Sequence, residues 1–528
     1  MAMLSSNLSK SKTLGVTRTD LGFVAVVVAL ELFLYARAVP LPGPDFALHT
    51  EPAIYFATEG IVKSPSLAAV DPAFQIAWGE YPPGFPLILG TWIDMFGYSF
   101  ASITGFHHCV HAISILILYS FLRIRFGTAP LATTLGCSFL IPWYGSFGQP
   151  DLTATVIGQL AWLVLGKNER FAEVCLSAFL IACSVLVSPM PGGQFAVIIA
   201  ADLAVKHSGS WKKMALRLLQ IISLSGISFC AIWAAFLRTQ PEPKLLLQQF
   251  MTPSLLRGDE VAVSMIDWTS PRIIVFFIIP FCIGVCGCLM APNFQRLLIS
   301  LRGNGTNESV GEARTLAAFI SSSLWCLLIS AGQFITGFHY GQLGPALIAS
   351  KLLSSKLYRG HHHLAFVAIL LQLSTLLYFD KTNLLYLMYG TQKEDNSPID
   401  YSRLYSKKVL GLDDLLWLDY YQLGKTQNAK WLAVGSHKKK EGASEEISLA
   451  VPKPDFILIS EYGFILHRFN ERSFPGYTLI PKEPADLIAE NLPKYPYKIR
   501  IYVSIERINA STSAIRNSAS SSAESREP

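Results

Sequence analysis

Long apolar runs separated by short polar connections dominate this chain. Each run is apolar around its whole circumference over roughly 14 to 22 residues, close to the length that a helix needs to cross a membrane. We therefore predict an all-α polytopic membrane protein with about 11 transmembrane helices. The predicted spans are 21–39, 103–122, 129–145, 152–166, 171–188, 192–206, 215–236, 272–290, 314–335, 340–353 and 363–379.

The charges in the short connections indicate an orientation. Lysine and arginine are enriched in cytoplasmic loops, and here they all fall on one side if the N-terminus is cytoplasmic. With an odd number of spans the C-terminus then lies outside, and the plasma (inner) membrane is the expected location. The basic positions are Lys10, Lys12, Arg18, Arg123, Arg125, Lys167, Arg170, Lys206, Lys212, Lys213, Arg217, Arg296, Arg302, Lys351, Lys356 and Arg359. A cleaved signal peptide is the alternative for the first span, but its apolar stretch exceeds the usual length, which favours an uncleaved anchor.

The pattern divides the chain into four parts. These are a cytoplasmic N-terminus (1–20), a transmembrane domain (21–379), a small extracytoplasmic α/β domain (380–508) and a disordered tail (509–528). Clusters of β-branched residues at 455–460 and 497–505 predict strands of the α/β domain. The tail is rich in serine, alanine and charge.

Two of the outer loops are long, 40–102 and 237–271. The apolar segment 83–97 in the first is predicted to be an interfacial helix, because a further span there would invert the charge bias of every later loop.

Composition supports a membrane protein. Hydrophobic residues make up 51% of the chain and charged residues 15%, whereas a soluble domain carries about 25% charge. The net charge of +6 comes from the short loops, so it does not suggest nucleic acid as a partner. Membrane lipids are the expected surroundings.

Few ionisable residues fall inside the predicted spans. Glu31 and Asp202 are the main ones. A transporter should carry a polar path across the membrane, because buried charges are expensive there and mark the route of the substrate. Glu31 is either a relay group or the partner of a neighbouring helix. Three histidines at the start of the second span (His107, His108 and His111) either pack there or contact a site.

The first outer loop carries the densest chemistry. Asp45 follows the first span, and Glu51 and Tyr55 follow at spacings that place them near one face of a helix. Glu80 and Tyr81 come next, within a proline-rich aromatic stretch that cannot be regular helix throughout.

This loop resembles that of the C-type glycosyltransferase superfamily, which includes protein O-mannosyltransferases and lipid A aminoarabinose transferases. The similar features are an acidic residue after span one, a helix ending in Glu-Gly, a Tyr-Pro-Pro turn and a closing Phe-Gly-Tyr-Ser. Gln149-Pro150-Asp151 is similar to the family's second acidic position. The segment 338–346, with His339 and Tyr340, is similar to the segment before a late span.

The resemblance implies an inverting transfer of a sugar from a polyprenyl-phosphate carrier to an extracytoplasmic glycan, lipid or protein. Asp45 is then the predicted general base, because a carboxylate can take the proton of the acceptor hydroxyl. Asp151 is the second catalytic candidate. For both aspartates a helix N-cap is the alternative reading. If a divalent cation takes part, these two would hold it.

Substrate binding is assigned to polar and basic residues expected on the outer side. The leaving lipid phosphate needs cations or hydrogen-bond donors, and for the basic residues a headgroup contact is the alternative. The candidates are Glu51, Glu80, Tyr81, Lys244, Arg257, Arg272, His339 and Tyr340. The sequence thus predicts a membrane glycosyltransferase, and the alternative is a transporter or flippase of a lipid-linked sugar without bond chemistry.

Overall fold

The computed structural model describes residues 17–36, 44–65, 72–79, 81–126, 148–165, 169–207 and 209–251, with parts of 314–321, 409–411, 456–460, 474–479 and 499–509. Four predicted spans, 129–145, 272–290, 340–353 and 363–379, lie outside the described residues, as does most of 314–335. The total of about 11 spans therefore stays a prediction.

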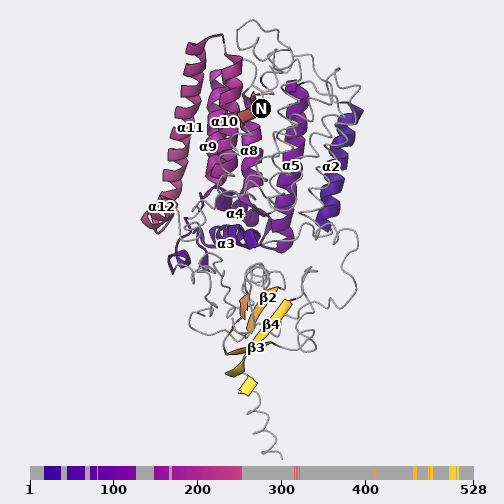
Figure 1. Ribbon diagram of the computed structural model, residues 1–528, viewed down its shortest axis with the longest axis vertical. Coiled ribbons are helices and arrows are strands. Elements are labelled where there is room, and N and C mark those ends of the chain that lie inside the picture. Colours follow the sequence, from indigo (N-terminus) through magenta and orange to yellow (C-terminus); the bar gives the residue numbers. More distant parts are fainter. Residues whose placement is uncertain are drawn as a thin grey trace, which may run out of the picture.

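Six long helices occupy predicted spans and lie side by side with roughly parallel axes (Figure 1). They are α2 (Arg18–Ala36), α5 (Phe100–Phe126), α8 (Pro150–Val164), α9 (Phe171–Val187), α10 (Pro189–Lys206) and α11 (Trp211–Thr239). Helix α9 packs against α8, α10 and α11, while α5 joins α8 to α2.

Small residues bring the central helices close together. A Cβ at Gly158 of α8 would lie 2.3 Å from the ring of Phe195 on α10, so the position accepts only glycine unless that ring moves. Two serines of α9 reach α8, with Ser177 Oγ donating to Ala161 O at 2.9 Å and Ser184 Oγ donating to Ala154 O at 2.7 Å. Close packing with interhelical hydrogen bonds is how helices associate where the hydrophobic effect between them is absent.

Two described stretches, Ala101–Ser120 and Trp211–Thr239, are long and apolar enough to cross a membrane by length and composition. Helix α11 leaves large apolar side chains exposed along its length, among them Leu216, Leu219, Ile222 and Ile227. A water-facing helix would carry polar residues there. Together with the composition, this arrangement is that of a helical membrane protein.

Short helices cover one end of the bundle. Helices α3 (Pro44–Glu59) and α4 (Gly84–Phe96) lie across it, and α12 (Pro243–Met251) follows α11 at the same end (Figure 1). We call this the α3–α4 end, and the opposite end, where α8 is followed by Glu169, the Glu169 end. The predicted interfacial segment 83–97 corresponds to α4.

The boundary predicted at residue 237 is wrong by a few positions. Helix α11 continues to Thr239, and Gln240 is its C-cap. Prolines at 241 and 243 explain the stop, because proline cannot continue a helix. The segment after it is also not a plain loop, since it begins with α12.

A four-stranded sheet lies beyond the α3–α4 end (Figure 1). The strands β1 (Val409–Gly411), β2 (Phe456–Ser460), β4 (Ile499–Ser504) and β3 (Tyr477–Leu479) follow in that spatial order. The pair β1–β2 is parallel and the other pairs are antiparallel. Strands β2 and β4 fall where β-branched clusters predicted them, while the limits of the C-terminal domain stay a prediction.

Candidate functional site

Helices α3 and α4 approach each other closely at Gly90. A Cβ at this position would lie 2.9 Å from Ala53 O and 2.7 Å from a ring carbon of Phe56, both on α3. The two helices therefore form one unit across the end of the bundle. This unit carries most of the candidate residues of the first loop.

Asp45 lies within the first turn of α3, because the helix begins at Pro44. The backbone N–H groups of a first helical turn and the helix dipole favour a negative charge there. The position is inside the helix, so the N-cap reading does not fit it. Its side chain lies outside the described residues.

Glu51 lies on the same helix and is buried, with 4% of its surface exposed. It accepts a hydrogen bond from Ser64 Oγ, in the segment that follows α3. Tyr55 lies beneath the ammonium group of Lys63, which is 4.6 Å from the ring centroid. The two candidates thus also hold the chain after α3 in place.

Tyr81 meets a buried histidine. The ring of His49 lies edge-on to Tyr81 with centroids 4.6 Å apart, and Trp78 stacks on Tyr81 at 6.3 Å. His49 is one helical turn after Asp45 on α3, so the two share a helix face. Sequence reasoning missed His49, because a single histidine in a helix carries no motif.

Asp151 lies at the start of α8, where it meets the start of α10. Gln149 is the N-cap of α8 and Asp151 follows Pro150 in the first turn, so the N-cap reading of Asp151 is wrong. Ser188 Oγ donates to Asp151 Oδ1 at 2.6 Å. The carboxylate is half-buried at the α3–α4 end.

The remaining candidates are less defined. Lys244 is exposed on α12. Glu80, Arg257, Arg272, His339 and Tyr340 lie outside the described residues. Within the described ranges, no group of three or more histidine, cysteine, aspartate or glutamate side chains is arranged to hold a metal ion.

Glu31 is paired with the neighbouring helix, the second of the two readings of its role. Its carboxylate contacts His108 Nδ1 at 2.8 Å and His111 Nδ1 at 2.5 Å, both on α5. Glu31 is 5% exposed, and a buried carboxylate needs such partners. Two of the three α5 histidines therefore pair the helices, while His107 packs against Phe85 of α4 with ring centroids 6.0 Å apart.

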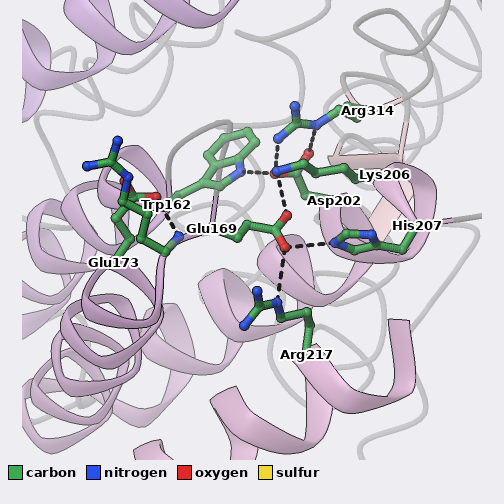
Figure 2. Close-up of polar contacts among 9 residues, drawn as sticks. Trp162, Glu169, Glu173, Asp202, Lys206, His207, Arg217 and Arg314 are labelled. Atoms are coloured by element: carbon green, nitrogen blue, oxygen red, sulfur yellow. Dashed lines mark hydrogen bonds and ion pairs between the residues drawn. The ribbon is translucent and has the colours of Figure 1, made fainter. Parts of the chain in front are cut away.

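The Glu169 end holds a denser ionic cluster (Figure 2). The carboxylate of Glu169 contacts Lys206 Nζ at 2.5 Å, His207 Nε2 at 2.7 Å and Arg217 Nε at 3.5 Å. Burial would raise the pKa of Glu169, but the hydrogen bonds from Lys206 and His207 outweigh it and hold the pKa below its ordinary value. Glu169 has a positive φ of 45°, a strained conformation that these contacts help to maintain.

Asp202 belongs to the same region and is 1% exposed. Arg314 binds it through two parallel contacts, Nε to Oδ1 at 2.5 Å and Nη2 to Oδ2 at 2.8 Å, and Trp162 Nε1 donates to Oδ2 at 3.1 Å (Figure 2). The carboxylate is therefore fully paired. The contacts around Glu169 and those around Asp202 both join helices, which is a structural role.

The sequence matches no protein-family model and no curated protein. Its fold is nevertheless similar to solved structures. ArnT from Cupriavidus metallidurans bound to undecaprenyl phosphate has a TM-score of 0.50 at 12% identity, over 91% of this chain and 98% of that one. The apo state of ArnT has a TM-score of 0.49 at 13% identity over the same shares. An oligosaccharyltransferase of Archaeoglobus fulgidus, tethered with an acceptor peptide, has a TM-score of 0.41 at 12% identity, over 78% of this chain and 64% of that one.

The chain thus has the fold of a polytopic membrane protein of the ArnT type. The kind of fold expected from the resemblance in the first outer loop is thus confirmed, as a fold similar to that of ArnT. At this identity the likeness concerns the fold alone.

Proposed function

We propose that the chain is a glycosyltransferase that moves a sugar from a polyprenyl-phosphate carrier to an acceptor outside the cytoplasm. One observation carries the proposal. The chain has the fold of ArnT over 91% of its length, and its two candidate catalytic aspartates lie in helices that begin at the same end of the bundle. ArnT has been solved with undecaprenyl phosphate, a carrier of the proposed class.

The α3–α4 end would face the outside of the cell. The basic residues of several short connections, Arg170, Lys206, Lys212 and Lys213 among them, lie at the opposite end. Such residues stay on the cytoplasmic side during insertion. The carrier would then present its phosphate beside α4, with its tail between the helices.

The proposed reaction forms one bond and breaks one. The acceptor hydroxyl oxygen attacks the anomeric carbon, and the bond from that carbon to the phosphate oxygen breaks with its electron pair leaving on the phosphate. The acceptor proton passes to the Asp45 carboxylate. A positioned base of this kind contributes about 10²–10⁴-fold to the rate.

Asp151 would orient the reacting groups. Its contact with the Ser188 hydroxyl fixes one carboxylate oxygen. The leaving phosphate gains negative charge and needs a cation. Lys244 is exposed on α12 at this end, and Arg257, Arg272 and His339 remain further predicted partners.

The test is transfer of labelled sugar by the purified protein in nanodiscs, with a panel of polyprenyl-phosphate sugars and a membrane extract as the source of acceptor. We expect the wild type to transfer label and Asp45→Asn to lose about 10²–10⁴-fold, because an amide cannot take the proton. Asp94→Asn is the matched control, since Asp94 is an exposed carboxylate on the adjacent α4.

Equal transfer by Asp45→Asn and wild type would remove Asp45 as the base and leave Asp151 as the next candidate. If the wild type transfers no sugar from any donor, the proposal fails. An assay of flipping of the lipid-linked sugar would then test the transporter alternative.

A further inference from the structure

Helix α12 is packed against the first loop with little space between them. A Cβ at Gly79 would lie 2.4 Å from the backbone oxygen of Leu246 on α12, so only glycine permits this approach. Leu246 also belongs to a buried apolar cluster. Its members are Val62, Phe74, Ala77 and Trp78 from the first loop, Phe236 from α11 and Leu246.

Gln249 of α12 forms two hydrogen bonds with the backbone of residues 77–79 in the first loop. Its Oε1 accepts from Gly79 N at 2.7 Å and its Nε2 donates to Ala77 O at 3.3 Å. A glutamine amide carries the donor and acceptor of a peptide group, so it satisfies irregular backbone as a neighbouring strand would. Ala77 and Gly79 are both buried, and backbone N–H and C=O groups left unpaired there would be unfavourable.

Gln240 repeats the arrangement where α11 ends. Its Oε1 accepts from Val62 N at 3.0 Å and its Nε2 donates to Gly60 O at 3.1 Å. The two fastened stretches are joined to each other, since Trp78 N donates to Val62 O at 2.9 Å. The segment that begins the second loop thus holds the first loop at two places.

The stretch held by Gln249 leads directly to a candidate substrate-binding residue. Tyr81 follows Gly79 by two positions, stacks on Trp78 and meets His49 of α3. Lys244 lies five residues before Gln249 on α12 and is exposed. Gln249 therefore links α12, the helix that carries a candidate phosphate partner, to the stretch that leads to Tyr81.

We propose that Gln249 is a positioning residue, which sets the place of Tyr81 relative to Lys244 and so aligns the sugar-carrying phosphate with the acceptor. This inference rests on the proposed glycosyltransferase function. It assigns to the second outer loop the task of fixing the geometry of the first. A displacement of about 1 Å far from the chemistry can lower a rate by about 100-fold.

The kinetic test compares three variants in the transfer assay. Gln249→Met keeps the length of the side chain but removes both hydrogen bonds, and we expect kcat/KM to fall by about 10- to 100-fold. Gln249→Glu keeps an acceptor for Gly79 N–H, so its kcat/KM should lie between those of Gln249→Met and the wild type. Gln248→Met changes the exposed neighbouring glutamine on α12 and should leave kcat/KM at the wild-type value.

A second measurement does not depend on activity. Hydrogen exchange of a peptide covering residues 74–82 should become faster in Gln249→Met and stay unchanged in Gln248→Met. Unchanged exchange in Gln249→Met overturns the inference, and so does faster exchange with an unaltered kcat/KM. If the wild type transfers no sugar, the proposed function fails, and the exchange result alone decides whether Gln249 holds the turn.

Discussion

Two carboxylates at one end of the helical bundle and two at the other contact groups of different kinds. At the Glu169 end, Glu169 and Asp202 each contact permanently charged lysine or arginine groups. At the α3–α4 end, Glu51 and Asp151 accept hydrogen bonds from the hydroxyls of Ser64 and Ser188, while Glu59 pairs with Lys63. An ion pair fixes a carboxylate and compensates its charge, and a hydrogen bond from a hydroxyl fixes the carboxylate oxygen that accepts it.

We expect the residues of the ionic cluster to hold the fold and those of the α3–α4 end to serve the proposed transfer. The ionic cluster of Figure 2 joins the ends of α8, α10 and α11 and the residue Arg314. The α3–α4 end instead brings loops and short helices together through aromatic contacts and amide hydrogen bonds. Substitutions at the first end should therefore act on stability, and those at the second on transfer.

The largest expected effect on stability is that of Asp202→Ala. Removing the carboxylate leaves the buried charge of Arg314 without its partner, which lowers the free energy of unfolding by about 3–5 kcal/mol. Thermal or denaturant unfolding in detergent measures the loss. Replacing both residues with apolar ones of similar size should recover much of it, and a double variant as unstable as the single one would contradict this account.

A smaller loss of stability should follow when Glu169 is protonated at low pH. Its pKa in the folded protein lies below the ordinary value of 4.5, so the folded state gives up this proton more readily than the unfolded state. The resulting stability is present above pH 4.5 and is lost as the pH falls through the folded pKa. Melting temperatures of wild type and Glu169→Gln should converge below pH 4.5, and a constant difference down to low pH would refute the pairing.

Gly90→Ala should lower the free energy of unfolding by about 1–3 kcal/mol. The new Cβ at the α3–α4 end would press against the backbone of Ala53 and the ring of Phe56. Transfer should fall with it, since α3 carries Asp45. Gly22→Ala on α2 is the control, because a Cβ there has no atom within 4 Å. Equal behaviour of the two variants in melting and transfer assays would show that the close approach has no consequence.

The smallest expected change in stability is that of Ser188→Ala, about 1 kcal/mol for one hydrogen bond to a half-buried carboxylate. Transfer should fall further than this loss explains, because Asp151 would lose the hydroxyl that fixes one of its oxygens. Rates per folded molecule and melting curves together check the point. A normal rate in a slightly less stable variant would assign Ser188 and Asp151 to structure alone.

The six described spans and the helix at 83–97 could be predicted from the sequence because hydropathy is a local property. Segment 83–97 was apolar and could not cross without reversing the charge bias, and it became α4. The partners of candidate residues could not be read in this way. Ser188 lies 37 residues from Asp151 and Gln249 lies 170 residues from Gly79. Contacts of this kind depend on how the helices approach one another, and the hydrophobic pattern of the sequence does not determine that approach.

Helix ends and the roles of single polar residues were also hard to predict from the sequence. Asp151 before an apolar run indicated an N-cap, but Pro150 starts α8 and gives the cap to Gln149. His49 and Gln249 carry no spacing signal. The small glycines at 79 and 90 were visible in the sequence as isolated positions, and a search for glycine within the polar loop and the interfacial helix would have pointed to close backbone approach.

The most direct measurement compares transfer per folded molecule for Asp45→Asn and Glu169→Gln, with the same labelled donor in nanodiscs. The account predicts that Asp45→Asn keeps the melting temperature and loses about 10²–10⁴-fold in rate, whereas Glu169→Gln melts earlier and keeps the wild-type rate. A wild-type rate in Asp45→Asn, or a loss of rate in folded Glu169→Gln, would contradict the division of the molecule into a reacting end and a holding end.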